Sequence, residues 1–388
     1  NHSHGIPAGF FLKLAASLTY FKYLPMTSRD QLKTIFDEAT SLAGNQHYDR
    51  ALEMFADLER QSREAGDMEM RMQAVAEQGY IYVDKLKNND KAFELFSVLE
   101  VLGMQANDAS NLLIARYGQA VSLAGMGTQF GKALDKFEEV ETMARQMGQR
   151  NILFSTLART ADIYFQHAEN YERALEKLEP YEAMCRESNN LVQLDSAMRV
   201  QAICLEKLER YQSALNKYSD RKALAMEMGR KDILVFCLIR SAYILTTHQE
   251  RFEESLRHYA EAEPICREIG EMDNLKACLQ SQAFLLRYKL KRYVEALEKY
   301  AAYEAFCHQQ GDDKDLIGIL ANQAWIHLEQ TGNLEEAMKR SVEMEALAIK
   351  LGDKENYINS LKNQVSIHKS WGEKDLAKEK KRRIREVK

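Results

Sequence analysis

The sequence Tyr171-Glu172-Arg173-Ala174-Leu175 carries the clearest signal in the chain, because its pattern recurs at a fixed distance. An aromatic residue, two variable residues, alanine and leucine also stand at 48–52, 130–134, 211–215 and 293–297. Variants begin at 89, 252 and 334, and a worn copy begins at 374, so successive starts are 40 or 41 residues apart. A period of this length predicts a repeat array in which neighbouring units bury one another's apolar faces.

Two further positions predict two helices in each repeat. Glycine or asparagine stands eighteen residues after each of the first eight starts, and both residues tolerate the left-handed conformation that ends a helix. These residues are Gly66, Asn107, Gly148, Asn189, Gly229, Gly270, Gly311 and Gly352. Thirty-one residues after each start the side chain is small, as a close contact between helices requires: Gly79, Ala120, Ala161, Ala202, Ala242, Ala283, Ala324 and Val365. We therefore expect a first helix, a short turn, a second helix and another short turn in each unit.

The repeat frame divides the 388 residues into three parts. Residues 29–373 are predicted to form eight repeats, and residues 374–388 to form a basic C-terminal capping helix. Within residues 1–28, the stretch from Gly9 to Leu24 is amphipathic if it is helical. Two interpretations of this N-terminal segment stay open. It is a leader, an end cap or a vector-encoded addition, or it is a tethered ligand for a hydrophobic groove, through which copies of the chain could self-associate.

Composition and charge argue against several classes of protein. The formal charge of −5 is too small for a general nucleic-acid footprint, so no nucleic-acid partner is expected. No stretch is long and apolar enough to span a bilayer, and no clean signal peptide is visible, so we expect a cytoplasmic protein. The six cysteines lack CxxC or zinc spacing, and three of them replace alanine at one repeat position: Cys185, Cys266 and Cys307. This pattern predicts core residues in a reducing compartment.

No motif in the chain indicates catalysis. The segment from Gly125 to Lys132 is not a phosphate-binding loop, because Ala133 occupies the serine or threonine position and no strand is expected before it. The nine histidines form no HExxH motif, and no nucleophile and base can be assigned to one another. We therefore expect a protein that is not an enzyme and has no catalytic residues, no metal site and no cofactor.

The repeat resembles the tetratricopeptide repeat. The resemblance rests on a small residue, then the aromatic-x-x-Ala-Leu pattern, then an apolar residue four positions after the alanine: Phe55, Phe96, Phe137, Tyr218, Tyr259 and Tyr300. It covers residues 29 to 388. Units this long that close with Gly-Asp, as Gly66-Asp67 does, are similar to those of kinesin light chain, Pins-type adaptors and bacterial tetratricopeptide regulators. The resemblance implies an all-α, right-handed superhelical α–α solenoid whose first helices line a concave groove.

A row of polar residues, six of them glutamine, directly precedes the small position of each repeat: Gln78, Gln119, Thr160, Gln201, Ser241, Gln282, Gln323 and Gln364. A carboxamide both donates and accepts hydrogen bonds, so such a row could bind the backbone of an extended peptide in the groove. The alternative is that each side chain bonds a neighbouring helix or packs at the edge of the apolar stripe.

The repeat, the resemblance and this row together predict a protein–protein interaction scaffold that binds a peptide or helix of a partner protein in the groove. The alternative function is a regulatory or sensor domain of a bacterial signalling or transcriptional regulator that responds to a peptide or partner protein. Such a domain would normally accompany an effector or DNA-binding domain, and none is visible in this sequence.

Overall fold

The computed structural model describes residues 28–387 as two compact units, one that ends at Met184 and one that begins at Cys185. Every regular element in this described part of the chain is a helix. None of these helices is long and apolar enough to cross a membrane. The N-terminal segment therefore lies outside the described residues except for Ser28, which caps the first helix of the repeats.

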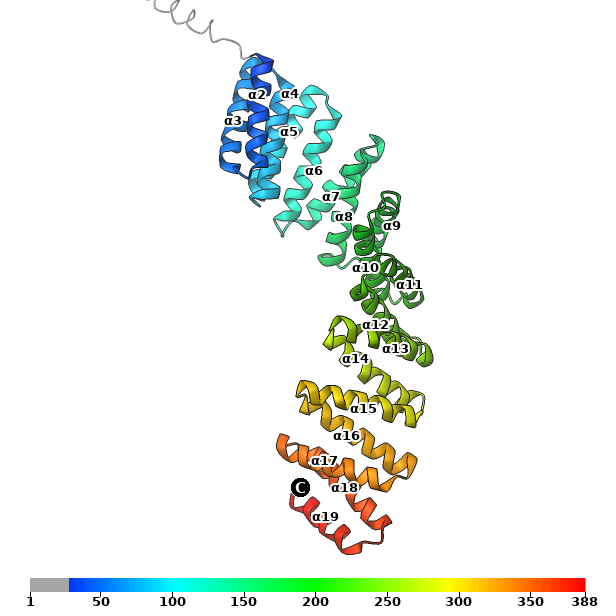
Figure 1. Ribbon diagram of the computed structural model, residues 1–388. Helices are drawn as coiled ribbons and strands as arrows, with labels where there is room; N and C mark the ends of the chain where they lie inside the picture. Colours follow the sequence, from blue (N-terminus) through cyan, green and yellow to red (C-terminus); the bar gives the residue numbers. More distant parts are fainter. Residues whose placement is uncertain (1–27, 388) are drawn as a thin grey trace, which may run out of the picture. The chain divides into compact units, whose positions relative to one another are not determined.

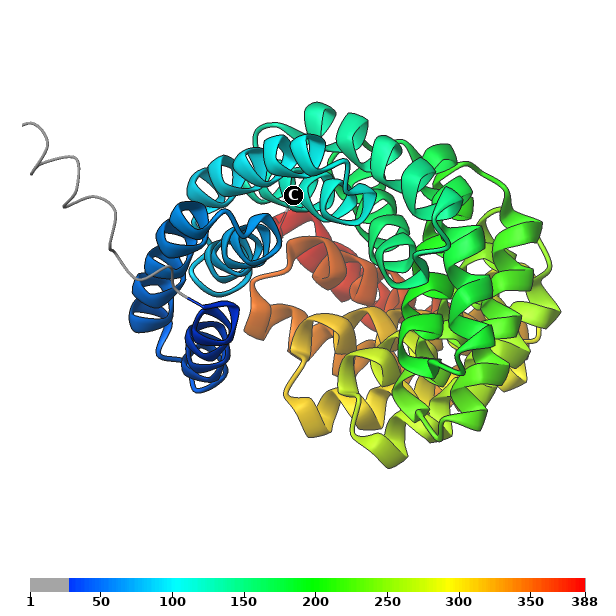
Figure 2. The same ribbon diagram turned by 90° about the horizontal axis from the view of Figure 1, so that it is seen from above.

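Unit 1 is a succession of helices that pack in chain order (Figure 1). Its helices are α2 (Arg29–Gly44), α3 (Tyr48–Ala65), α4 (Met68–Tyr80) with the π-helical turn η1 (Ile81–Lys85), α5 (Asn89–Ala106), α6 (Ala109–Gly125), α7 (Phe130–Gln146), α8 (Arg150–Gln166) and most of α9 (Tyr171–Glu187). The first helices of successive repeats, α2, α4, α6 and α8, also contact one another. Figure 2 shows these helices side by side, from blue to green.

Unit 2 continues the same plan. Its helices are α10 (Leu191–Lys207), α11 (Tyr211–Glu227), α12 (Lys231–Thr247), α13 (Phe252–Ile269), α14 (Met272–Phe284) with η2 (Leu285–Lys289), α15 (Tyr293–Gln310), α16 (Asp313–Ile326) with η3 (His327–Thr331), α17 (Leu334–Leu351), α18 (Lys354–Ser370) and α19 (Lys374–Val387). Figure 1 shows α15, α16, α17 and α18 as neighbours in this order. The last helix packs on α18, so α19 is the second helix of a ninth pair.

The repeat frame coincides with the helix boundaries. All nine starts are the first residues of second helices, from Tyr48 in α3 to Lys374 in α19. The eight glycine and asparagine residues all have positive φ values, from 51° at Asn107 and Asn189 to 75° at Gly66 and Gly270. Both features confirm the predicted helix–turn–helix unit.

The aspartates after several of these turns start the next helix. The carboxylate of Asp67 accepts a hydrogen bond from the backbone N–H of Met70 at 3.0 Å, and Asp353 accepts one from Asn356 at 3.0 Å. Each bond satisfies an N–H group that the first turn of a helix leaves unpaired. The Gly-Asp pair therefore ends one helix and begins the next within two residues.

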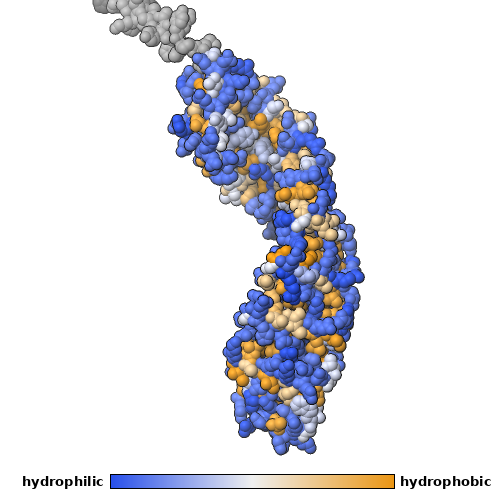
Figure 3. Space-filling model, viewed as in Figure 1, coloured by the Kyte–Doolittle hydropathy of each residue, from blue (hydrophilic) through white to orange (hydrophobic). Residues whose placement is uncertain are grey.

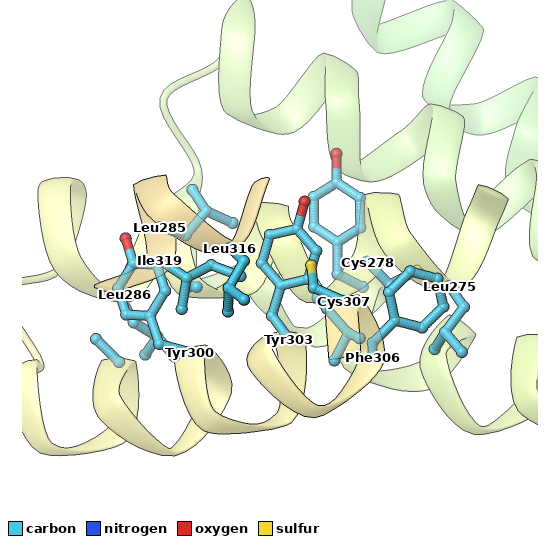
Figure 4. Packing of buried hydrophobic residues seen from close by; sticks show 14 of the residues in the cluster. Leu275, Cys278, Leu285, Leu286, Tyr300, Tyr303, Phe306, Cys307, Leu316 and Ile319 are labelled. Carbon is cyan, nitrogen blue, oxygen red and sulfur yellow. The ribbon is translucent and has the colours of Figure 1, made fainter. Parts of the chain in front are cut away.

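The cores of both units are made from the positions that the frame identifies. In unit 2, Tyr300 and Tyr303 of α15 lie beside Ile319 and Leu316 of α16, and Phe306 lies beside Leu275 of α14, as Figure 4 shows. All six cysteines are buried, as expected of packing residues. Burial raises the pKa of Cys204 to about 12 and that of Cys237 to about 11, which keeps both thiols protonated at neutral pH.

Candidate functional site

The polar row before the small position lies inside the protein. All eight side chains are between 0% and 7% exposed: Gln78, Gln119, Thr160, Gln201, Ser241, Gln282, Gln323 and Gln364. A buried amide must find a hydrogen-bond partner or lose free energy. The partners of these amides therefore determine what the row does.

Most of these partners are glutamates of the preceding second helix. Gln119 Nε2 donates to Glu100, Gln282 Nε2 to Glu263 and Gln323 Nε2 to Glu304, each at 2.8 Å and each over 19 residues. Gln364 Nε2 donates to Glu345 over the same separation, at 2.6 Å. We call this arrangement the polar ladder. Gln78 differs, because its amide donates within its own helix to the carbonyl oxygen of Ala74 at 3.2 Å.

Cations from the following second helix complete the ladder. Lys177 Nζ lies 2.8 Å from Glu141, Lys299 Nζ 2.8 Å from Glu263 and Arg340 Nη1 2.8 Å from Glu304, in each case over 36 residues. At the end of the chain, Arg383 of α19 bonds Glu345. Each ladder glutamate with both partners thus joins two second helices and the first helix between them.

The pKa values of the ladder glutamates show that these bonds outweigh burial. Burial alone would raise the pKa of Glu263, but the hydrogen bonds from Lys299, Gln282 and Arg267 lower it below its usual value. The pKa of Glu100 is lowered in the same way, against its burial, by Gln119, Lys136 and Arg116. Four ladder carboxylates are therefore charged at neutral pH although their side chains are only 11–18% exposed: Glu100, Glu141, Glu263 and Glu345.

The side chains of the polar row are covered, and four of its amides are bonded to ladder glutamates. The peptide-contacting role of the row stays a prediction. The glutamates were missed by the sequence analysis, although glutamate stands eleven residues after seven of the eight starts: Glu59, Glu100, Glu141, Glu182, Glu263, Glu304 and Glu345. That regularity was the available signal.

The residue after the small position forms a second row, and three of its members in unit 2 are aromatic. Tyr243, Phe284 and Trp325 stand one residue after Ala242, Ala283 and Ala324, on α12, α14 and α16. Phe236 lies two turns before Tyr243 on the same side of α12, and Tyr288 lies four residues after Phe284. We call Phe236, Tyr243, Phe284, Tyr288 and Trp325 the aromatic face; the first four are 36–45% exposed and Trp325 is half-buried.

An arginine without an acidic partner lies within the aromatic face. The guanidinium carbon of Arg287 is 4.4 Å from the ring centroids of both Tyr288 and Trp325. Arg287 Nη1 donates to the Tyr288 hydroxyl at 2.7 Å, and that hydroxyl donates to Asn322 Oδ1 at 3.0 Å. Arg287 Nε is buried and has no hydrogen-bond partner. No carboxylate among residues 28–387 pairs with Arg287.

The other arginines near the aromatic face are paired. Arg240 lies over Tyr243 at 5.4 Å and bonds Glu206, and Arg221 lies over Phe236 at 5.1 Å and bonds Asp195 at 2.7 Å. Arg287 is distinguished by its place in η2, where the chain makes a π-helical turn at the end of α14. Such turns displace side chains from the regular α-helical positions and are frequent at functional sites.

Other features of the described residues are less specific. A cavity of about 510 Å³ in unit 1 is lined by charged Asp84, Arg159 and Asp162 and by Phe130, on which His167 stacks at 4.0 Å. No group of three His, Cys, Asp or Glu side chains in the described part of the chain could hold a metal ion. On the side seen in Figure 3, hydrophilic residues dominate and hydrophobic residues form small separate patches.

The described part of the chain repeats a pair of helices, and a left-handed turn follows the second helix in eight repeats, an arrangement similar to that of the tetratricopeptide repeat. No protein-family model matches the sequence, and no curated protein matches it. Among solved structures, the apo form of RapI is similar at 11% identity and a TM-score of 0.47, over 92% of this chain and 97% of that chain. The apo form of the quorum sensor NprR from Bacillus thuringiensis is similar at 14% identity and a TM-score of 0.39, over 87% of this chain and 98% of that chain. A signal transduction ATPase from Pyrococcus horikoshii with a tetratricopeptide repeat sensor is similar at 16% identity and a TM-score of 0.40, over 92% of this chain and 56% of that chain.

Proposed function

We propose that this protein is an interaction scaffold that binds a peptide or helix of a partner protein on the aromatic face of unit 2. The observation that carries the proposal is Arg287, a half-buried guanidinium that is held between two rings and lacks an acidic partner. The partner segment is expected to place an acidic side chain on Arg287 and apolar or aromatic side chains on the surrounding rings.

The chemistry of the aromatic face suits such a segment. A carboxylate can accept two parallel hydrogen bonds from a guanidinium, and these charge-assisted bonds are about twice as strong as neutral ones. Tyrosine, tryptophan and arginine dominate the energetics of protein interfaces because they combine large apolar area with a polar group. The Tyr288 and Trp325 rings also restrict the guanidinium before binding, so less side-chain freedom is lost when a partner arrives.

The polar ladder fixes two of the helices that carry the aromatic face. In unit 2 it bonds first helices α14, α16 and α18 to the second helices that precede them. Side chains on α14 and α16 are consequently presented from elements that are held by charge-assisted bonds. A binding surface on such elements is more precisely positioned than one on loops.

We also propose binding rather than catalysis. A cysteine nucleophile requires a thiolate, and burial raises the pKa of Cys307 to about 11, as it does for Cys237. Burial is the main cause that lowers the pKa of His327, and its ring nitrogen lies 3.4 Å from the hydroxyl of the exposed Thr331, four residues later in the same π-helical turn. These groups suit packing rather than chemistry.

Peptide selection against the purified protein tests the proposal. Peptides selected from a random display library should be enriched in an acidic residue flanked by apolar or aromatic residues. Arg287→Ala should weaken binding of a selected peptide about thirtyfold or more, since truncation of one member of a buried charge pair costs about 2–5 kcal/mol. Fluorescence anisotropy with the labelled peptide measures this change.

Lys369 provides the matched control, because it occupies the same repeat position on α18 and is exposed. Lys369→Ala should leave the affinity within twofold of that of the unmodified protein. Selected peptides without acidic residues, or equal affinities for the Arg287→Ala and unmodified proteins, would contradict the proposal.

A further inference from the structure

One repeat departs from the polar ladder at all three of its positions. Lys222 on α11 stands where other second helices have glutamate, and Ser241 on α12 stands where other first helices mostly have glutamine. His258 on α13 stands where the next second helix elsewhere has Lys177, Lys299 or Arg340. The carboxylate and the amide are therefore both missing from this one junction between repeats.

The replacements leave a cavity of about 270 Å³ between α11, α12 and α13, which we call the α11–α13 pocket. Lys222, Ser241 and His258 all line it. The side chain of serine has three heavy atoms fewer than that of glutamine, and this difference leaves space between the helices. Leu238 and Leu245 form its buried side. The volume is far above the roughly 10–15 Å³ that one water molecule requires. Exposed residues form its rim: Gln212, Asn216 and Ser219.

Two polar groups at the pocket lack partners. His258 Nδ1 is buried and has no hydrogen-bond partner, and the hydroxyl of Ser241, a 6% exposed residue, bonds no described residue. Buried polar atoms without partners are rare in folded proteins, because each costs free energy. A ligand that bonds the His258 ring would remove that cost, and the Ser241 hydroxyl could donate a hydrogen bond to the same ligand.

The charges of the pocket indicate which ligand fits. Lys222 and Arg251 are permanent cations in the lining, whereas Glu254 is its one acidic residue. Glu254 is already bonded by Arg251 Nε at 2.7 Å. Outside the lining, Glu261 pairs with Lys222 Nζ at 2.6 Å and is 46% exposed, so this pair is screened by solvent. The lining consequently has an excess of positive charge and of hydrogen-bond donors.

We propose that the α11–α13 pocket binds a carboxylate group, which Lys222, the Ser241 hydroxyl and protonated His258 hold together. The carboxylate takes the place of the missing ladder glutamate, with the cations now on both sides of it. It comes from an acidic side chain of a partner peptide or from a small free carboxylic acid. The pocket is distinct from the aromatic face, and this inference does not depend on the function proposed for that face.

Protonation of His258 gives the proposal a spectroscopic readout. Burial is the main cause that lowers the pKa of His258 in the free protein; Lys222 and Arg257 lower it further, whereas Glu261 and Glu254 oppose them. A carboxylate beside the imidazole favours the charged ring and should raise this pKa. The change is opposite to the one that simple filling of the pocket by an uncharged group would cause.

The test is a titration of the full chain with N-acetyl-L-glutamate amide, followed by the NMR signals of the His258 ring, with glutarate and the peptide Ala-Glu-Ala in parallel. The uncharged isostere N-acetyl-L-glutamine amide is the control ligand. At least one of the three acids should bind tenfold more tightly than the isostere and raise the pKa of His258. Tighter binding of the peptide identifies an acidic side chain as the ligand, and tighter binding of glutarate identifies a free acid.

Ser241→Gln should abolish this binding, because it introduces the residue of the other repeats and fills the pocket. Thr160→Gln is its matched control: the same repeat position changes, but Glu141 and Lys177 are still present there, and binding should be unchanged. Lys222→Gln, at a half-buried side chain, should weaken binding at least tenfold and covers the case in which Ser241→Gln does not fold. Equal affinity for acids and isostere, or full binding by both folded variants, would overturn the proposal.

Discussion

The side of Gly118 on α6 faces the ring of Phe96 on α5, and a methyl group at residue 118 would overlap that ring. Phe96 is fully buried, and a Cβ atom added at Gly79 on α4 would also lie within 2.8 Å of it. The ring of Phe96 is therefore enclosed by two glycines on two neighbouring first helices. Packing, and not backbone conformation, requires glycine at these two positions, since neither residue has a positive φ value.

Gly118→Ala should destabilise the protein by about 1–3 kcal/mol, because overpacking of a filled core forces side chains and backbone to move. Gly318→Ala on α16 is the control, since a Cβ atom there would meet nothing within 4 Å. That change should instead stabilise by roughly 0.5–1 kcal/mol, because alanine loses less conformational freedom than glycine in a helix. Urea denaturation followed by circular dichroism measures both, and equal effects of the two variants would refute the packing argument.

Glu304→Ala should be more destabilising than the loss of an exposed glutamate from the same helix. It removes the acceptor of both Gln323 and Arg340, whose Nε is already buried without a partner. An unsatisfied buried donor costs about 1–3 kcal/mol, so a loss of this size is expected. Glu298→Ala, at an exposed position of α15, should change the free energy of unfolding by less than about 0.5 kcal/mol. Similar losses from the two variants would show that the polar ladder contributes little to stability.

The stability of the protein should fall as the pH is lowered below about 4.3, the pKa of an unperturbed glutamate. The folded-state pKa values of Glu141, Glu263 and Glu345 are lowered by their partners against the effect of burial. A lowered folded-state pKa means that the unfolded chain binds the proton first, so the stabilisation is complete above pH 4.3. It is lost progressively as the pH falls through the folded-state values.

Denaturation in urea at a series of pH values from 7 to 3 measures this dependence. Glu263→Gln should show a shallower loss of stability below pH 4.3 than the unmodified protein, because one linked carboxyl group is absent. Glu298→Gln, which changes an exposed group, should keep the original slope. A variant Glu263→Gln with an unchanged slope would mean that other groups govern acid unfolding.

The helix boundaries were predictable because they are set by local chain chemistry. Positive φ values at Gly66 and Asn107 and the cap at Asp67 depend on a few neighbouring residues, and the repeat makes each signal visible eight times. The N-terminal segment stays untested, since it lies outside the described residues.

The burial of the polar side chains and their hydrogen-bond partners were harder to predict from the sequence. The position of Gln282 in the repeat indicated a polar row, but its partner Glu263 lies 19 residues earlier, on another helix. The repeat period identifies the residues that occupy equivalent positions. It does not identify which rows of equivalent residues are in contact. Arg287 was missed for a further reason: its place between Tyr288 and Trp325 depends on the π-helical turn η2, and a regular α-helical projection misplaces residues in such a turn.

The bonds of Glu263 and Glu304 cross from one repeat to the next, so the polar ladder couples the unfolding of neighbouring repeats. Stability in such arrays resembles a one-dimensional chain of units with nearest-neighbour terms. At the Lys222, Ser241 and His258 junction the ladder carboxylate and amide are both absent from that term, and Lys222 pairs instead with Glu261, which is 46% exposed. We therefore expect the unfolding of neighbouring repeats to be less tightly coupled at this junction than where the polar ladder is complete.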